Sequence, residues 1–205
     1  MRELWYAEGR GEIGPIEGAW LRLRPVEERD LPALMAWVVE PEVLYWWDDE
    51  MADLAETRTE FLAPDDGGPR EGYIIEEGAR GVAGRPVGYI QWWHRSYDPH
   101  YHWTAGIDIF IGEPDARERG VGTEAVRMLL GYLFEVRKLH RVTIDPESGN
   151  ARAIRSYQKA GFRLDGLLRH NEFIRGEYID TQMLAILEDE WPAAKALWES
   201  ERGKG

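Results

Sequence analysis

The sequence contains no cysteine, and this absence excludes a disulfide framework, a thiol nucleophile and a thiolate metal site. No apolar run is as long as a membrane span, and the N-terminus has no signal-peptide core. These absences favour a protein of the cytoplasm. Histidine is also scarce: His100 and His102 are spaced to share a strand face, but no third ligand is suitably placed, so we expect no bound metal.

Positive charge is the other scarce property of the chain. It has 25 lysines and arginines against 38 aspartates and glutamates, which gives a formal net charge of −13. Such a field repels nucleic acid and anionic membranes and attracts cations. We therefore expect neither nucleic acid nor a membrane as a partner. Two interpretations of the acidity stay open: it serves solubility, or it serves a polycationic substrate.

What the chain does contain fits one folded unit. Its 205 residues are enough for a single domain with a full core. The start of the chain is rich in glycine, so we expect residues 1–19 to form an N-terminal extension and residues 20–205 to form the domain. The ten tryptophans, several of them in pairs, predict aromatic walls as well as core packing. Both a monomer and a homodimer stay open.

The spacing of apolar residues predicts the order of strands and helices. Strands are expected near residues 20–24, 73–76, 87–93, 104–111, 141–145, 163–170 and 177–187. Helices are expected near residues 28–40, 53–62, 120–134, 150–160 and 189–201. Pro41 is expected to close the first helix, and Trp46 and Trp47 are expected to lie on the loop that follows it.

Two segments near the centre of the chain carry the chemistry. Residues 117–123, Arg-Glu-Arg-Gly-Val-Gly-Thr, form a basic turn that opens into an amphipathic helix. The free backbone N–H groups of such a turn and the positive end of the helix dipole bind a diphosphate. Residues 150–161 predict a second helix that contains Tyr157, with Asn150 as its N-cap and Gly161 after its last turn.

At this separation the two segments resemble the acyl-CoA site of the GCN5-related N-acetyltransferases, whose glycine turn reads Gln/Arg-x-x-Gly-x-Gly/Ala. Arg117, Gly120 and Gly122 fill its three fixed positions. The resemblance implies an α+β fold, in which helices flank a mixed, mostly antiparallel sheet. Two parallel central strands of that sheet splay apart, and the helix after the glycine turn joins them. The resemblance also implies acetyl-CoA as the co-substrate.

The expected contacts with acetyl-CoA come from three places. The amides of residues 119–123 would hold the pyrophosphate, and those of residues 109–111 would bind the thioester oxygen as it becomes an oxyanion. Asn150 and Lys159 would reach the pantetheine arm or the phosphates. In full, the expected cofactor-binding residues are Ile109, Phe110, Ile111, Arg117, Arg119, Gly120, Val121, Gly122, Thr123, Asn150, Ala153 and Lys159.

Asp108 is the expected base. It stands inside a predicted strand, where aspartate is disfavoured, on the face opposite Ile107 and Ile109. An ammonium group with a pKa of about 8–10 is no nucleophile until it is deprotonated, so a carboxylate here would bind the ammonium and help it lose a proton. The alternative is a structural carboxylate paired with an arginine.

Tyr157 is the expected acid. A phenol with a pKa near 10 is protonated at neutral pH and can donate to the departing CoA thiolate. In the family that this chain resembles, the tyrosine at this position has that role. The alternative is a core tyrosine. Because the chain has no cysteine, we expect direct transfer in a ternary complex, without an acyl-enzyme.

Within the superfamily the chain resembles the aminoglycoside 6′-N-acetyltransferases from about residue 20 to residue 187. The segments that carry this resemblance are Leu21-Arg-Leu-Arg-Pro, Tyr45-Trp-Trp, Gly88-Tyr-Ile-Gln, Gly106-Ile-Asp and Asp145-Pro. The resemblance implies an antibiotic-resistance enzyme that acetylates the drug's 6′-amine, with Asp108 and Asp145 at the drug's amines. Siderophore-assembly relatives carry histidine where Asp108 stands, so this aspartate favours the aminoglycoside side.

The expected substrate-binding residues are mostly aromatic or acidic. The paired tryptophans would stack under a sugar ring. For Asp145 two interpretations stay open, since an aspartate followed by proline is also a common turn starter. In full, these residues are Trp46, Trp47, Asp48, Gln91, Asp98, Asp108, Asp145 and Asp180. Two alternatives stay open: transfer to a protein N-terminus, a polyamine or a siderophore precursor, and a non-catalytic sensor that binds acyl-CoA.

Overall fold

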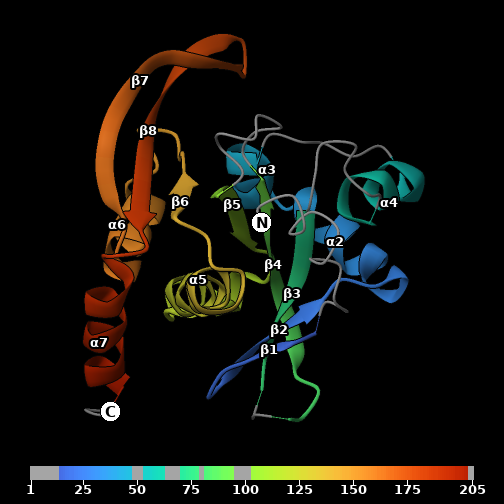
Figure 1. Ribbon diagram of the computed structural model, residues 1–205. Coiled ribbons are helices and arrows are strands. Elements are labelled where there is room, and N and C mark those ends of the chain that lie inside the picture. Colours follow the sequence, from blue (N-terminus) through green and yellow to red (C-terminus); the bar gives the residue numbers. More distant parts are fainter. Residues whose placement is uncertain (1–13, 48–52, 63–69, 79–80, 95–102, 203–205) are drawn as a thin grey trace.

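The described residues of the chain form one eight-stranded sheet with helices on both faces (Figure 1). The structure is a computed structural model, and it describes residues 14–47, 53–62, 70–78, 81–94 and 103–202. The strands follow the spatial order β1-β2-β3-β4-β5-β6-β8-β7. Their bounds are β1 (Ile16–Glu17), β2 (Leu21–Pro25), β3 (Arg70–Glu77), β4 (Arg85–His94), β5 (Thr104–Ile111), β6 (Arg141–Ile144), β7 (Arg163–Ile174) and β8 (Glu177–Leu187).

The helices lie close to the predicted positions. They are α2 (Leu31–Val38), α3 (Pro41–Trp47), α4 (Leu54–Leu62), α5 (Val121–Gly131), α6 (Ala151–Ala160) and α7 (Trp191–Arg202). Short helical turns occur at η1 (Glu28–Asp30) and η2 (Pro114–Ala116), and a π-helical turn, η3 (Tyr132–Val136), continues α5. The loop predicted for Trp46 and Trp47 was wrong: both lie in α3. Pro41 begins this helix, because the first helical position needs no backbone donor.

The sheet opens between its two parallel strands. All neighbouring strands are antiparallel except β5 and β6, which α5 connects. The pairing of β5 with β6 runs only from Thr104↔Arg141 to Gly106↔Thr143. Residues 107–111 of β5 therefore have no partner strand on that side, while β4 still pairs with them on the other. The predicted mixed sheet with a splayed parallel pair is confirmed.

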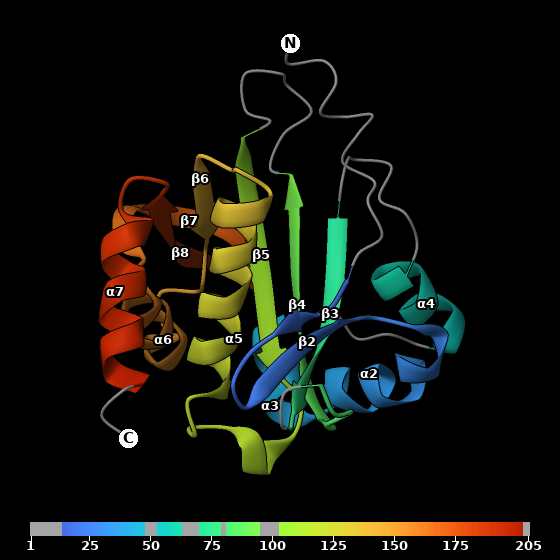
Figure 2. The same cartoon turned by 60° about the horizontal axis from the view of Figure 1, so that its bottom comes forward.

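Two apolar cores lie on opposite faces of the sheet (Figure 2). Helices α5 and α7 cover one face, where Ile107 and Trp92 are fully buried. Helices α2, α3 and α4 cover the other, where Tyr89 and Phe110 pack against Trp37. The alternation along β5 thus points Ile107 and Phe110 into different cores.

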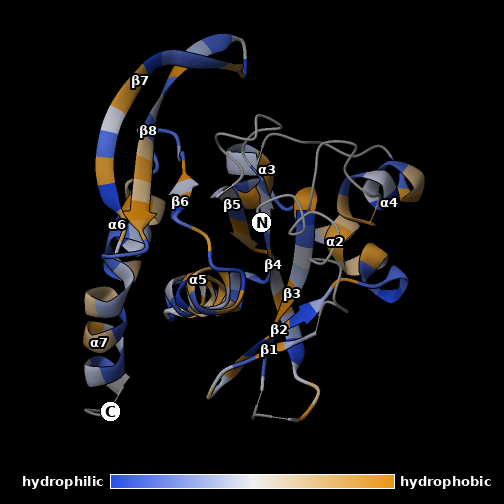
Figure 3. Ribbon diagram, in the orientation of Figure 1, coloured by the Kyte–Doolittle hydropathy of each residue, from blue (hydrophilic) through white to orange (hydrophobic). Residues whose placement is uncertain are grey.

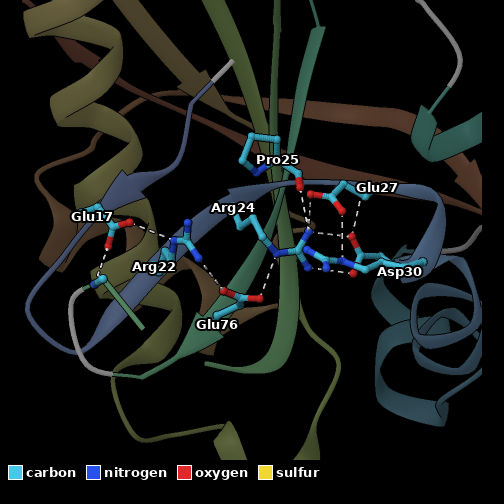
Figure 4. Close-up of polar contacts among 9 residues, drawn as sticks. Glu17, Arg22, Arg24, Pro25, Glu27, Asp30 and Glu76 are labelled. Atoms are coloured by element: carbon cyan, nitrogen blue, oxygen red, sulfur yellow. Dashed lines mark hydrogen bonds and ion pairs between the residues drawn. The ribbon is translucent and has the colours of Figure 1, made fainter. Parts of the chain in front are cut away.

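A buried arginine fastens the second core to the sheet (Figure 4). The Arg24 guanidinium donates to both oxygens of Asp30, at 2.9 and 2.8 Å, and its Nε donates to Glu76 at 2.9 Å. The paired carboxylates raise the pKa of Arg24, although burial opposes the shift. Asp30 is the last residue before α2, so this network sets where α2 begins on the sheet.

The two edges of the sheet differ in exposure. Strand β1 pairs with β2, with Ile16 opposite Leu23, so the described part of the predicted extension joins the sheet. At the other edge, β7 carries bands of hydrophobic and hydrophilic residues (Figure 3), and Leu164 and Leu167 are exposed. None of the helices in the described ranges is long and apolar enough to cross a membrane.

Candidate active site

A cavity of ≈ 660 Å³ opens where β5 and β6 separate. Its walls come from α3 and α4 on one side, from β5 and the start of α5 in the middle, and from the β6–α6 segment and β7 on the other. This volume is typical of sites for small molecules. The basic side chains of its lining come from the turn before α5 and from α6, whereas five carboxylates, Asp108 among them, line the other end. Two further carboxylates, Glu42 and Glu118, lie at the basic turn, where Glu42 pairs with Arg117.

The basic end is built on the start of α5. Gly120 precedes the helix with φ 85°, a left-handed conformation that glycine adopts without strain. No side chain caps this helix, so the first amides of α5 keep their donors for a ligand. A Cβ at Gly122 would point between Ile111 and Ser156, each 3.9 Å away, and would narrow the cavity. The turn can therefore cradle an anion.

Helix α6 supplies cations beside this turn. The Asn150 side chain accepts a hydrogen bond from the amide of Ala153 at 3.1 Å, which confirms the predicted N-cap. The hydroxyls of Thr123 and Ser156 share a hydrogen bond of 2.7 Å that ties α5 to α6. The basic side chains in this part of the lining are Arg152, Arg155 and Lys159. Of these three, only Lys159 was predicted from the sequence.

The two arginines of the glycine turn have other partners. Arg117 is mostly buried; it donates to Glu42 at 2.7 Å and to the Ile111 carbonyl at 3.0 Å, and it also pairs with Glu40. This pairing lowers the pKa of Glu40. Arg119 is exposed, pairs with Glu77 at 3.1 Å and does not line the cavity. Arg117 thus fastens α3 to the turn, and its charge is already balanced.

Asp108 stands at the acidic end, opposite Gln91 in the pairing of β4 with β5. The Gln91 Nε2 donates to Asp108 Oδ2 at 3.1 Å. Burial raises the pKa of Asp108 to about 7, the hydrogen bond from Gln91 opposes this shift, and the charge of Asp145 adds to it. A carboxylate with this pKa can take up a proton near neutral pH.

Tyr157 reaches the same cavity from α6. It is only 7% exposed, and its hydroxyl has no hydrogen-bond partner among the described residues. Burial and the nearby charge of Asp108 both raise the pKa of Tyr157, so the phenol keeps its proton. The structure therefore brings the two predicted catalytic residues to one cavity, from elements far apart in the sequence.

Five further carboxylates of the lining were not predicted from the sequence: Glu42 and Glu118 at the glycine turn, Glu60 on α4, Glu147 after β6, and Glu172 on β7. Burial raises the pKa of Glu172, and the charges of Asp145 and Glu147 add to the shift. Glu147 follows Asp145 by two residues, which is the only local signal. Nothing near Glu60 or Glu172 in the sequence relates them to the others, because only the fold brings them together.

Aromatic and hairpin residues complete the wall of the cavity. Trp46 and Trp47 both line it, and Trp47 also packs edge-on against Phe110 at 4.9 Å, so it serves the core as well. Arg175, at the tip of the β7–β8 hairpin, donates to Glu147 at 2.6 Å, and its guanidinium lies 4.2 Å above the Tyr45 ring. The hairpin tip is thereby held against α3.

The remaining predicted residues are not all brought to the cavity. Gln91, Asp145, Ile109, Phe110, Ile111 and Val121 line it. Asp180 does not: its carboxylate accepts a hydrogen bond from the His170 amide at 2.8 Å. Asp48 and Asp98 lie outside the described residues. In the described part of the chain, no group of three or more histidine, aspartate or glutamate side chains could hold a metal ion.

Comparison with known proteins identifies the family. Residues 26–169 match the family described as "Acetyltransferase (GNAT) domain". The aminoglycoside N(6')-acetyltransferase type 1 of Klebsiella pneumoniae is 32% identical over 160 residues, which cover 70% of this chain and 74% of that protein. The spermidine N(1)-acetyltransferase of Escherichia coli (strain K12) is 24% identical over 180 residues, which cover 84% and 89%.

Solved structures share the fold. The spermidine N-acetyltransferase of Vibrio cholerae, in complex with CoA and spermine, has a TM-score of 0.71 at 21% identity, covering 84% of this chain and 98% of that one. The aminoglycoside acetyltransferase AAC(6')-Ib, in complex with coenzyme A, has a TM-score of 0.70 at 24% identity, covering 85% and 99%. The chain belongs to the GCN5-related N-acetyltransferases and is an acetyltransferase of amines.

Proposed function

We propose that the protein transfers the acetyl group of acetyl-CoA to a primary amine of a polycationic small molecule, most favourably the 6′-amine of an aminoglycoside. The observation that carries this proposal is the division of one cavity. Its basic end has uncapped helix amides, and its acidic end gathers five carboxylates. Those carboxylates are Glu60, Asp108, Asp145, Glu147 and Glu172. A cation with several amines is the ligand that such an end attracts.

The basic end fits acetyl-CoA, which supplies the acetyl group as a thioester. The uncapped amides of residues 121–123 would hold the pyrophosphate, and Arg155 and Lys159 would add positive charge. The unpaired edge of β5 from residue 107 to residue 111 would lie along the pantetheine arm. Acetyl-CoA held in this way would place its thioester beside Asp108 and Tyr157, where the basic and acidic ends of the cavity meet.

In the proposed chemistry, Asp108 accepts a proton and Tyr157 donates one. Asp108 takes a proton from the substrate ammonium, and the free amine nitrogen then forms a bond to the thioester carbonyl carbon. The bond from that carbon to sulfur breaks, and the Tyr157 hydroxyl donates a proton to the thiolate. The acylated nitrogen gives its remaining extra proton to the Tyr157 phenolate, which restores the phenol, and Asp108 releases its proton to solvent. The Tyr157 phenol is protonated at the start of every cycle, because burial and the charge of Asp108 raise its pKa.

A second candidate acceptor is a linear polyamine. The same five carboxylates would accommodate it, and the relatives named above include spermidine acetyltransferases. Trp46 and Trp47 favour the aminoglycoside, since aromatic faces stack on sugar rings and have less to offer a flexible chain. The test must therefore separate these two acceptors.

The test is release of CoA thiol from acetyl-CoA with a panel of amines. The panel contains kanamycin, tobramycin, an aminoglycoside without a 6′-amine, spermidine and a peptide. Turnover that needs the 6′-amine supports the proposal. Turnover with spermidine alone supports the second candidate, and turnover with the peptide alone contradicts both.

A further inference from the structure

Polar side chains from three neighbouring strands meet behind Asp108. Gln91 lies at the centre of this group, and its Oε1 accepts two hydrogen bonds: one from Arg70 Nε at 2.9 Å and one from the Tyr89 hydroxyl at 2.9 Å. Its Nε2 donates to Asp108 at 3.1 Å. Strand β3 supplies Arg70, β4 supplies Tyr89 and Gln91, and β5 supplies Asp108. The amide thus connects the arginine to the carboxylate.

The chemistry of the neighbours fixes which way this amide points. A side-chain amide accepts at its oxygen and donates at its nitrogen, whereas an arginine only donates and a carboxylate only accepts. Arg70 therefore requires the amide oxygen, which leaves the amide nitrogen for Asp108. The Tyr89 hydroxyl can donate or accept, so it tolerates either orientation. Arg70 is the neighbour that excludes the flipped amide.

An ion pair holds Arg70 in place. Its Nη2 donates to Glu60 Oε1 at 2.7 Å, and Glu60 belongs to α4, on the face of the sheet that carries the second core. The charges of Arg70 and Glu60 act on Asp108 in opposite directions. The direct field of Arg70 at Asp108 is thus partly offset, and the hydrogen bond from Gln91 lowers the pKa of Asp108 more than the Arg70 charge does.

We propose that Arg70 is a positioning residue: by donating to Gln91 it fixes the amide that hydrogen-bonds Asp108, and so keeps the base ionised. If the amide turned over, its oxygen would face Asp108, and a hydrogen bond would form only with the protonated carboxyl. The proposal rests on the proposed role of Asp108 in the reaction. The charges of Arg70, Glu60 and Asp145 act on Asp108, and Asp108 in turn acts on the Tyr89 and Tyr157 hydroxyls. Glu147 and Glu172 are the other carboxylates at this end of the cavity.

The test is a direct titration of the Asp108 carboxyl by carbon NMR, in protein labelled at aspartate and assigned with Asp108→Asn. Arg70→Met keeps the length of the side chain and removes its donors. We expect it to raise the pKa of Asp108 by about one pH unit, the effect of a lost hydrogen bond to a charged group. Arg70→Lys keeps the charge without the fork, and we expect a smaller rise. Tyr89→Phe should leave the titration near that of the wild type.

Gln91→Met provides the decisive background. If Arg70 acts through Gln91, adding Arg70→Met to Gln91→Met should move the titration no further. An equal shift in both backgrounds would show a direct field and overturn the proposal, as would no shift in either. Should Arg70→Met fail to fold, as judged by its melting temperature, Arg70→Lys carries the same comparison.

Kinetics separate this proposal from the proposed function. The acid limb of the kcat/KM profile should move upward with the titration in Arg70→Met. If the carboxyl titration moves and the activity profile does not, Arg70 still positions the amide, and Asp108 is not the base. If neither moves, the positioning role is refuted whatever the reaction.

Discussion

Replacing Tyr157 by phenylalanine removes one oxygen from the wall of the cavity and leaves the ring in place. The ring packs near Phe162, with centroids 6.3 Å apart, and the residue is 7% exposed. The hydroxyl has no hydrogen-bond partner among the described residues, so its loss leaves no buried donor or acceptor unpaired. We expect the free energy of unfolding to change by less than about 0.5 kcal/mol.

The effect on catalysis should be much larger. Burial and the charge of Asp108 keep the Tyr157 phenol protonated, and so it is ready to donate throughout the usual assay range. General acid catalysis contributes roughly 10²-fold at the lower end of its range, which suits a thiolate leaving group. We therefore expect kcat to fall about 100-fold, or about 2.7 kcal/mol in activation free energy, with the affinity for acetyl-CoA unchanged.

The assay combines steady-state thiol release, calorimetric titration with acetyl-CoA and thermal unfolding. Tyr132→Phe is the matched control, because the Tyr132 hydroxyl donates to the buried Glu71 at 3.0 Å, outside the cavity lining. We expect the control to lose stability and to keep its kcat. If Tyr157→Phe behaved like the control, with an unchanged kcat and a lower melting temperature, Tyr157 would be a core tyrosine and the assignment would fail.

Four other outcomes follow from the cavity. Asp108→Asn should lower kcat/KM at least about tenfold and abolish its rise with pH through about 7, as a pH–rate profile would show. Because the fold raises the pKa of Asp108 from 3.8 to about 7, the free energy of unfolding of the wild type should fall as the pH rises between these values. Urea unfolding of Asp108→Asn should lack this part of the pH dependence. Gly120→Ala, strained at φ 85° by about 1–2 kcal/mol, should weaken acetyl-CoA binding in a calorimetric titration. Glu172→Gln should raise KM for a polycationic amine and reduce the salt dependence of that KM, while a monoamine should show neither effect.

Local patterns in the sequence predicted the parts of the fold that local interactions determine. The apolar spacing and the end residues of α5 and α6 were enough to predict where these helices lie. The left-handed glycines at 120 and 161 and the cap at Asn150 act within one helical turn, so their effect is visible in the local sequence. The strand around Asp108 was predicted at its observed bounds. The parallel pair that the glycine-turn helix connects was implied by the family resemblance and is confirmed. Asp108 was singled out as an aspartate inside a strand, and Tyr157 by its place in the helix that resembles the family motif. The structure brings both to one cavity, and their catalytic roles stay predictions.

The rest of the site depends on contacts between distant residues. Glu60 and Glu172 belong to different elements, and no periodicity relates them, so their place in one cavity could not be predicted. The role of Arg117 was also hidden, since its partners Glu40 and Glu42 precede it by more than seventy positions. A charged residue with no ion-pair partner nearby in the sequence can thus be ion-paired in the fold.

Glu42 gives the cavity a property that bears on how such an enzyme adapts. This one carboxylate pairs with Arg117 at 2.7 Å and also with Arg152, so it joins α3 to the glycine turn and to α6. The same helix carries Trp46 and Trp47, which line the cavity and are proposed to contact the acceptor amine. A substitution in α3 that is selected for a new amine therefore also disturbs the turn proposed to hold the pyrophosphate. New acceptor ranges should arise more readily through β7, whose Glu172 lines the acidic end away from the turn.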